Sequence, residues 1–159
     1  MTIFNPPGQP SPQSESQTLQ GGSFFPAIDI AKFAVEMRLA SQVTPERVRA
    51  ALVDAMIQVE GDAQLVARVA LWRDDGYTAL EEVPSTDFGG EHRLAFLYRR
   101  AVFSYAKHLV DDQYRDNGMT AAGEARAEGV DVVVGSHLRN ARNALSDLVG
   151  RPRATIELL

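Results

Sequence analysis

The stretch that most constrains this fold runs from Glu91 to Asn117. Apolar residues recur in it at three- and four-residue steps, the spacing of one apolar face of an α-helix: Leu94, Leu97, Tyr98, Ala101, Tyr105 and Leu109. A second apolar line follows a seven-residue step on a different side of the same helix: Phe96, Phe103 and Val110. Asn117 and Gly118 tolerate left-handed backbone, so we predict that the helix ends there.

A surface helix of a monomer needs one buried stripe, whereas this one has two. Two alternatives follow. The helix is either a central core helix wrapped by its own neighbours, or it keeps one stripe for its own bundle and offers the other to another subunit.

Composition limits the class of protein. A chain of 159 residues fits one domain with a real core. It has no cysteine, which suits a reducing cytoplasm and removes disulfides and thiol chemistry. The net charge of -5 argues against a protein that coats nucleic acid by neutralising phosphates. We find no secretory signal and no run of about 20 apolar residues that would span a membrane.

Both ends are expected to be extended arms. Residues 1–23 are rich in Pro, Gln, Ser and Gly, and their prolines prevent a helix, so we predict an arm that a partner surface would order. Residues 24–150 are expected to form the helical domain. Residues 151–159, RPRATIELL, form a second arm with Ile156 and Leu158 on one face. Such an arm is suited to adding a strand to another chain's sheet edge.

The middle of the chain predicts an all-α fold, a small bundle of about four helices between the two arms. Asp29 is positioned to cap a short helix, and Thr44-Pro45-Glu46 is a strong start for the next. The apolar stripe of this second helix resumes beyond Gly61, and the glycine weakens the prediction of a single unbroken helix. A last helix is predicted over 119–149, although its VDVVVG run favours strand locally.

Two segments are expected to dock on this bundle. The connection 77–90 contains TALEEVP, predicted to place Leu80 and Val83 on the core, with a cap for the central helix at Ser85, Thr86 or Asp87. The aromatic pair Phe24-Phe25 has two interpretations. It either plugs the domain's own core or anchors into a neighbouring chain.

We find no pattern that predicts catalysis. The chain has no phosphate-binding glycine loop, no GxSxG elbow and no paired Glu-x-x-His motif. His108 with Asp111 and Asp112 lies within one helical turn, but solvated polar groups explain them better than a metal. Adjacent acids such as Glu81-Glu82 do not by themselves hold two carboxyls about 5–10 Å apart across a cleft. We therefore expect no catalytic, cofactor or metal site, and Arg99-Arg100 is expected to be one ion-pair partner and one solvated residue.

Several segments in order carry a family resemblance: FFPAID after the Pro-rich arm, EMRL, SQVTPERVRAALVDAM, GYTALEEVP, YRRAV and the ending RPRATIELL. Together they resemble the head-completion (head-stabilisation) proteins of contractile-tailed bacteriophages. The resemblance implies a helical adaptor that forms a ring of about twelve copies, a closed heterologous assembly, under the portal protein after DNA packaging. The ring would extend the channel, retain the genome, and present a surface to the next neck or tail-terminator protein.

The same resemblance implies a location in the neck of the virion, after assembly in the host cytoplasm, and no catalytic residues. Its C-terminal segment would reach the portal. The hypothetical portal or neighbour contacts are Phe24, Phe25, Arg153, Ala154, Thr155, Ile156, Glu157, Leu158 and Leu159.

Two further sets are hypothetical. The stripe of Phe96, Phe103 and Val110 would pack between subunits, and Glu81, Glu82, Asp111 and Asp112 would face a channel through which DNA passes without sequence-specific binding. The alternative function is a helical regulator or small-molecule-binding bundle, which requires a roomy apolar pocket with converging polar groups.

Overall fold

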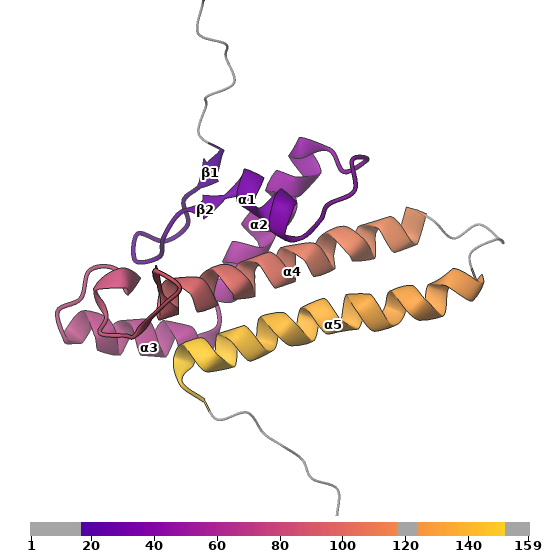
Figure 1. Cartoon of the computed structure of the whole chain (residues 1–159). Coiled ribbons are helices and arrows are strands. Elements are labelled where there is room, and N and C mark those ends of the chain that lie inside the picture. Colours follow the sequence, from indigo (N-terminus) through magenta and orange to yellow (C-terminus); the bar gives the residue numbers. More distant parts are fainter. Residues whose placement is uncertain (1–16, 118–123, 152–159) are drawn as a thin grey trace, which may run out of the picture.

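The structure, a computed structural model, describes the backbone of residues 17–117 and 124–151, with side chains for 17–113 and 135–151. The described chain is mostly helical (Figure 1). Its longest helices, α4 (Arg93–Asn117) and α5 (Glu124–Val149), lie side by side and antiparallel, and α2 (Pro45–Glu60) packs against α4. No helix among the described residues is long and apolar enough to cross a membrane.

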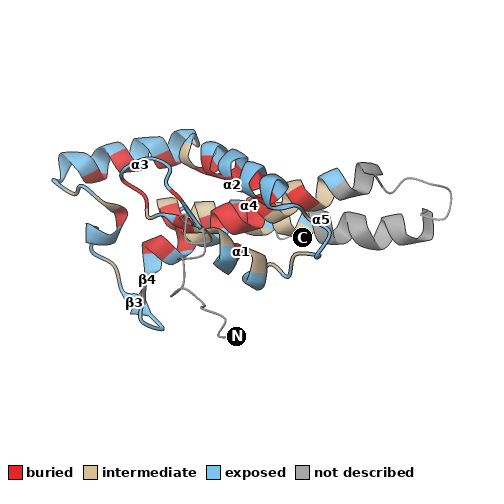
Figure 2. Ribbon diagram, turned by 90° about the horizontal axis from the view of Figure 1, so that it is seen from above, coloured by how far each residue is buried: buried red, intermediate tan, exposed pale blue. Residues whose placement is uncertain are grey.

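The central helix α4 is wrapped by its own chain, which decides between the two alternatives for its stripes. Tyr98 and Phe103 are fully buried, and Val110 is 2% exposed. Phe103 meets the ring of Phe33 edge-on, with 5.2 Å between ring centroids. The hypothesis that Phe103 and Val110 pack between subunits is therefore wrong, because both side chains lie in the chain's own core, Phe103 against Phe33 of α1 (Ile30–Glu36). Figure 2 shows the buried residues along α4. Phe96 alone of that line stays open, at 42% exposure.

The start of α4 differs from the prediction, since none of residues 85–87 caps it. Strands β3 (Asp87–Phe88) and β4 (Glu91–His92) form an antiparallel hairpin instead, and α4 follows directly. Gly89 and Gly90 have φ of 61° and 78°, the left-handed pair that a tight hairpin turn requires. Before the hairpin, Leu80 and Val83 are buried around a short 3-10 helix η1 (Leu80–Glu82), as was predicted for the TALEEVP segment, called the docking turn below.

The stretch after Thr44 forms two helices rather than one. Thr44 caps α2, accepting a hydrogen bond at Oγ1 from the backbone N–H of Arg47 at 3.4 Å. The helix ends at Gly61, and Asp62 caps α3 (Ala63–Asp74) with one carboxylate oxygen that accepts from two backbone N–H groups. The break thus falls where the glycine weakened the helical pattern.

The N-terminal boundary and the aromatic pair need correction. Strand β1 (Thr18–Leu19) pairs antiparallel with β2 (Ile28–Asp29), and Leu19 is 5% exposed, so residues 17–23 belong to the folded domain rather than to an arm. Phe24 and Phe25 are 1% and 8% exposed. Both rings plug the chain's own core, which leaves them little surface for a portal or a neighbour.

These two rings close the end of the bundle. Phe24 stacks on Trp72 of α3, with 6.1 Å between centroids, and Phe25 stacks on Tyr98 of α4 at 4.7 Å. The carbonyl of Phe24 accepts a hydrogen bond from the N–H of Leu80 at 2.8 Å. One short segment therefore joins α3, α4 and the docking turn.

The fold class is largely as predicted, with an amendment. The described part contains five α-helices, but also the small two-stranded sheets β1–β2 and β3–β4, so it is mostly helical rather than all-α. At the other end α5 stops at Val149, and Gly150 has a φ of 77°. The hypothetical contact residues 153–159 lie outside the described residues, as do residues 1–16 of the N-terminal arm.

Candidate interaction surface

A groove of about 330 Å³ lies between the segment 18–21 and the outer side of α2. The segment forms one wall, and α2 forms the other with Arg49, Val53, Met56, Ile57 and Glu60. A basic side chain thus stands near one end of the helical wall and an acidic one near the other. The groove lies at the surface, since most of the residues along it are exposed.

The carboxylate of Glu60, which lines this groove, joins the N-terminal segment to α4. Its Oε2 accepts a hydrogen bond from the backbone N–H of Gly22 at 2.8 Å, and its Oε1 accepts one from the hydroxyl of Tyr98 at 2.6 Å. Burial, reinforced by this carboxylate, strongly raises the pKa of Tyr98, so its hydroxyl remains a donor. A Cβ at Gly21 would overlap Glu60 Oε1, so only glycine lets the backbone approach so closely.

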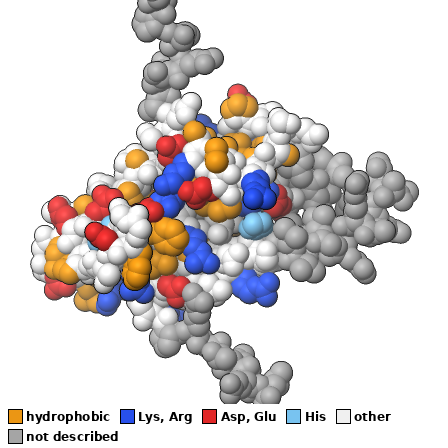
Figure 3. Space-filling view, viewed as in Figure 1, with side chains coloured by type: hydrophobic (Ala, Val, Ile, Leu, Met, Phe, Trp, Pro, Cys, Tyr) orange, Lys and Arg blue, Asp and Glu red, His pale blue; other side chains and the backbone are white. Residues whose placement is uncertain are grey.

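The helical wall of the groove carries two exposed apolar side chains. Val53 and Ile57 are 38% and 61% exposed, although they lie on a helix whose opposite face is fully buried. On α3, Val66 and Leu71 are also about half exposed. In the view of Figure 3, apolar side chains are interspersed with charged ones, so exposed apolar residues form small separate patches on that face.

The predicted channel-facing acids have different environments. Glu81 is exposed. The carboxylate of Glu82 accepts hydrogen bonds from the N–H and hydroxyl of Thr78, at 2.7 and 2.9 Å, and these bonds lower its pKa. Asp111 lies between α4 and α5, 2.6 Å from Lys107 Nζ and 3.8 Å from His137 Nε2. The carboxylates of Glu82 and Asp111 therefore already have hydrogen-bond or ion-pair partners within the chain. The side chain of Asp112 is partly buried.

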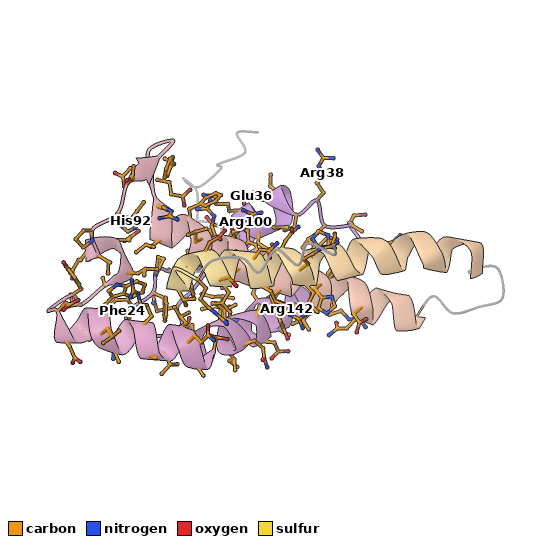
Figure 4. All side chains as sticks on the ribbon, turned by 90° about the horizontal axis from the view of Figure 1, so that it is seen from below. Phe24, Glu36, Arg38, His92, Arg100 and Arg142 are labelled. Carbon is orange, nitrogen blue, oxygen red and sulfur yellow. The ribbon has the colours of Figure 1, made fainter. Side chains whose placement is uncertain are left out.

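The histidines have structural surroundings. Burial lowers the pKa of His137 despite the opposing charge of Asp111. His92, in strand β4 of the hairpin, contacts the carbonyl of Val83 through Nε2 at 2.9 Å (Figure 4). Among the described residues, no three His, Asp or Glu side chains gather closely enough to hold a metal ion. His108 with Asp111 and Asp112 is thus not such a group.

The basic pair on α4 divides as expected. Arg99 forms a bidentate ion pair with Glu91, and its guanidinium lies over the ring of Phe96, 5.4 Å from the ring centroid. Arg100 is exposed. The paired guanidinium therefore fixes the hairpin to the first turns of α4, while its neighbour remains at the surface.

Comparison with known proteins supplies the decisive finding. Residues 19–159 match the family model described as phage head completion protein (GPL). The chain belongs to this family. The match begins at Leu19, the buried residue of β1, which agrees with placing that strand inside the folded domain.

Two phage proteins are similar to this head completion family member over most of their length. The head completion/stabilization protein of Escherichia phage P2 is 31% identical over 147 residues, which cover 92% of this chain and 86% of the relative. The probable head completion/stabilization protein of Haemophilus phage HP1 (strain HP1c1) is 26% identical over 147 residues, covering 91% and 94%. No solved structure matches. The resemblance found in the sequence is thus confirmed at the level of the family.

The groove of this head completion protein was missed by sequence reasoning, although signals for it exist. Val53 and Ile57 lie four residues apart and off the stripe formed by Leu52, Met56 and Val59. Such an extra apolar pair on a helix is a sign of a second contact face. Gly21-Gly22 marks a close backbone approach, but its partner Glu60 lies 38 residues from Gly22, beyond local pattern analysis.

Proposed function

We propose that this chain is a structural adaptor of the phage neck, not an enzyme. About twelve copies form a closed ring under the portal protein after DNA packaging, retain the genome and offer a docking surface to the next neck protein and the tail. The observation that carries this proposal is the family match over residues 19–159. The ring resides in the virion and is assembled in the host cytoplasm.

The distribution of exposed apolar side chains supports repeated contacts. In a ring each subunit uses two different patches, one for each neighbour. Val53 and Ile57, one helical turn apart beside the groove, are the pair that can serve as one such patch on α2. Phe88 at the hairpin and Phe96 at the start of α4 are single exposed residues of a kind that is normal on protein surfaces, so they add no support.

Charge supports a channel that does not hold DNA. The chain carries a formal net charge of -5. Of the four acids considered, Glu81 is the exposed one with no role in the docking turn, so it is the strongest candidate for the channel wall. We expect Glu81→Lys to slow DNA ejection by attracting phosphates. Particles of normal composition and unchanged ejection kinetics would contradict this assignment.

The regulator alternative gains no specific support. A small-molecule site is a concave, mostly apolar pocket that buries its ligand. The groove beside α2 is instead a surface feature with exposed walls and a charged side chain near each end. Such a shape suits an extended chain better than an enclosed ligand.

Electron microscopy of this protein mixed with the portal ring of the same phage tests the proposal. We expect a second ring stacked on the portal, with density for residues 153–159 on the portal surface. A chain shortened by residues 151–159 should keep its fold and lose portal binding. No association at high concentration, with both partners folded, would overturn the adaptor function.

A further inference from the structure

We propose that the groove between β1 and α2 receives residues 2–5 of a second copy of this chain, which add as a strand to the outer edge of β1. This interface deepens the proposed function. It rests on that function in one respect, which is that copies of the chain contact one another. Three independent features of the groove support it: an unpaired strand edge, an exposed apolar wall and the composition of the segment that would fill it.

The outer edge of β1 is free to accept a strand. The N–H of Ile30 donates to the carbonyl of Gln17 at 2.7 Å, and Leu19 is paired with Ile28. In an antiparallel ladder, backbone groups alternate between the two sides of a strand. The N–H and C=O of Thr18 therefore point away from β2. No strand among the described residues pairs with that side, because this sheet consists of β1 and β2. An open edge of this kind is a template for strand addition.

The apolar wall has the spacing that an extended segment matches. Val53 and Ile57 are one helical turn apart, a rise of about 6 Å at about 1.5 Å per residue. Alternate residues of a strand are separated by about 6.5–7 Å. One strand lying along α2 can thus contact both side chains. Covering them would remove from water the two largest exposed apolar groups of that helix.

The chain's own N-terminal segment has the composition of the occupant. Residues 1–16 lie outside the described part, and within them Thr2, Ile3 and Phe4 are strand-forming residues free of proline. Strand addition needs backbone N–H donors, which proline lacks. The following residues, 6–16, contain four prolines and join this stretch to Gln17 beside the groove.

The length of chain between Asn5 and Gln17 allows the segment to reach a groove on another copy. Fully extended at about 3.1 Å per residue, residues 6–16 would span about 34 Å. The proposal is that Ile3 and Phe4 enter the same groove of a neighbouring copy rather than their own. Each copy then gives one strand and receives one, the head-to-tail pattern of a ring.

Disulfide trapping tests this interface, because the chain has no cysteine of its own. Full-length Ile57→Cys chains are mixed with differently tagged Ile3→Cys or Phe4→Cys chains under mild oxidation. We expect mixed disulfides between the two chains. One of the two positions should react several-fold more than the other, because adjacent side chains of a strand point to opposite sides. The matched control replaces Ile57→Cys by Leu71→Cys, an apolar position of α3 that is also about half exposed.

Three outcomes would overturn the proposal. The first is a yield of mixed disulfide no higher than with Leu71→Cys, and the second is an equal yield at positions 3 and 4. The third is that a chain carrying both cysteines forms the disulfide only within itself. A second variant, Ile57→Asp, should leave the urea midpoint nearly unchanged, since the side chain is 61% exposed. It should abolish trapping between Val53→Cys and whichever of Ile3→Cys and Phe4→Cys reacts better. Trapping without rings on the portal would overturn the adaptor function alone. Rings without trapping would overturn the strand exchange alone.

Discussion

The junction of Tyr98, Glu60 and Gly22 makes the most specific stability prediction. One carboxylate joins the N-terminal segment to α2 and α4, with hydrogen bonds of 2.8 Å from Gly22 and 2.6 Å from Tyr98. Tyr98→Phe removes one of these bonds while keeping the ring that stacks on Phe25. The substitution therefore isolates the hydroxyl from the packing.

The expected loss follows from the geometry. A hydrogen bond to a charged acceptor contributes about 1.5–3 kcal/mol net. Glu60 is partly exposed, so water can replace the lost donor, and we expect Tyr98→Phe to lower the free energy of unfolding by about 1.5 kcal/mol. Glu60→Ala should cost more, about 2–4 kcal/mol, because it leaves the fully buried Tyr98 hydroxyl without its acceptor and frees the N–H of Gly22.

A double-mutant cycle provides the assay. Urea unfolding of the wild type, both single variants and the double variant can be followed by the fluorescence of Trp72, the single tryptophan, which is buried against Phe24. We expect a coupling energy of about 1 kcal/mol or more, since the two side chains share one bond. Additivity within about 0.5 kcal/mol would refute the argument that the bond between Tyr98 and Glu60 stabilises the fold.

The remaining predictions concern two glycines and two titrating groups. Gly135→Ala should raise the free energy of unfolding by about 0.5–1 kcal/mol in urea titrations, because a Cβ there meets nothing within 4 Å inside α5. Gly21→Ala should lower it by about 1–3 kcal/mol, because the added methyl group displaces Glu60 from Tyr98. In the folded state the pKa of His137 lies below its ordinary value of 6.5. The free energy of unfolding therefore keeps its full value above that pH and decreases as the pH falls below it, because the unfolded state binds the proton more readily. His137→Gln should flatten this part of the pH–stability curve. The pKa of Glu82 lies below 4.5, so its contribution is lost as the pH falls below that value, and Glu82→Gln should remove this acid-side loss in urea unfolding at several pH values.

Features written in local sequence were predicted correctly. Thr44 and Pro45 start α2, and Gly61 interrupts the helix. Each signal acts within one or two helical turns, through a cap or a backbone preference. Leu80 and Val83 were also placed on the core correctly, because apolar residues flanking a proline-marked turn have few other places to go.

Features that depend on distant partners were not predictable in this way. The seven-residue line Phe96, Phe103 and Val110 showed that α4 has a second apolar side, but periodicity does not say which chain covers it. The answer depended on Phe33 of α1, which lies 70 residues before Phe103 in the sequence and packs against it. Strands β1–β4 were missed because each has two residues, too few for an alternating pattern, although Gly89-Gly90 is a recognisable turn signal.

The fate of that second stripe changes where contacts between copies should be sought. Phe96 is its one open member, and Arg99 already lies over its ring while Glu91 holds the guanidinium in place. A partner at this position would have to displace or desolvate a paired charge, which costs free energy unless it supplies a replacement. Val53 and Ile57 are exposed, and they lie beside an edge of β1 with which no strand of the described part pairs. The α2 face is therefore the less costly surface to bury, which supports placing the proposed strand exchange there rather than along α4.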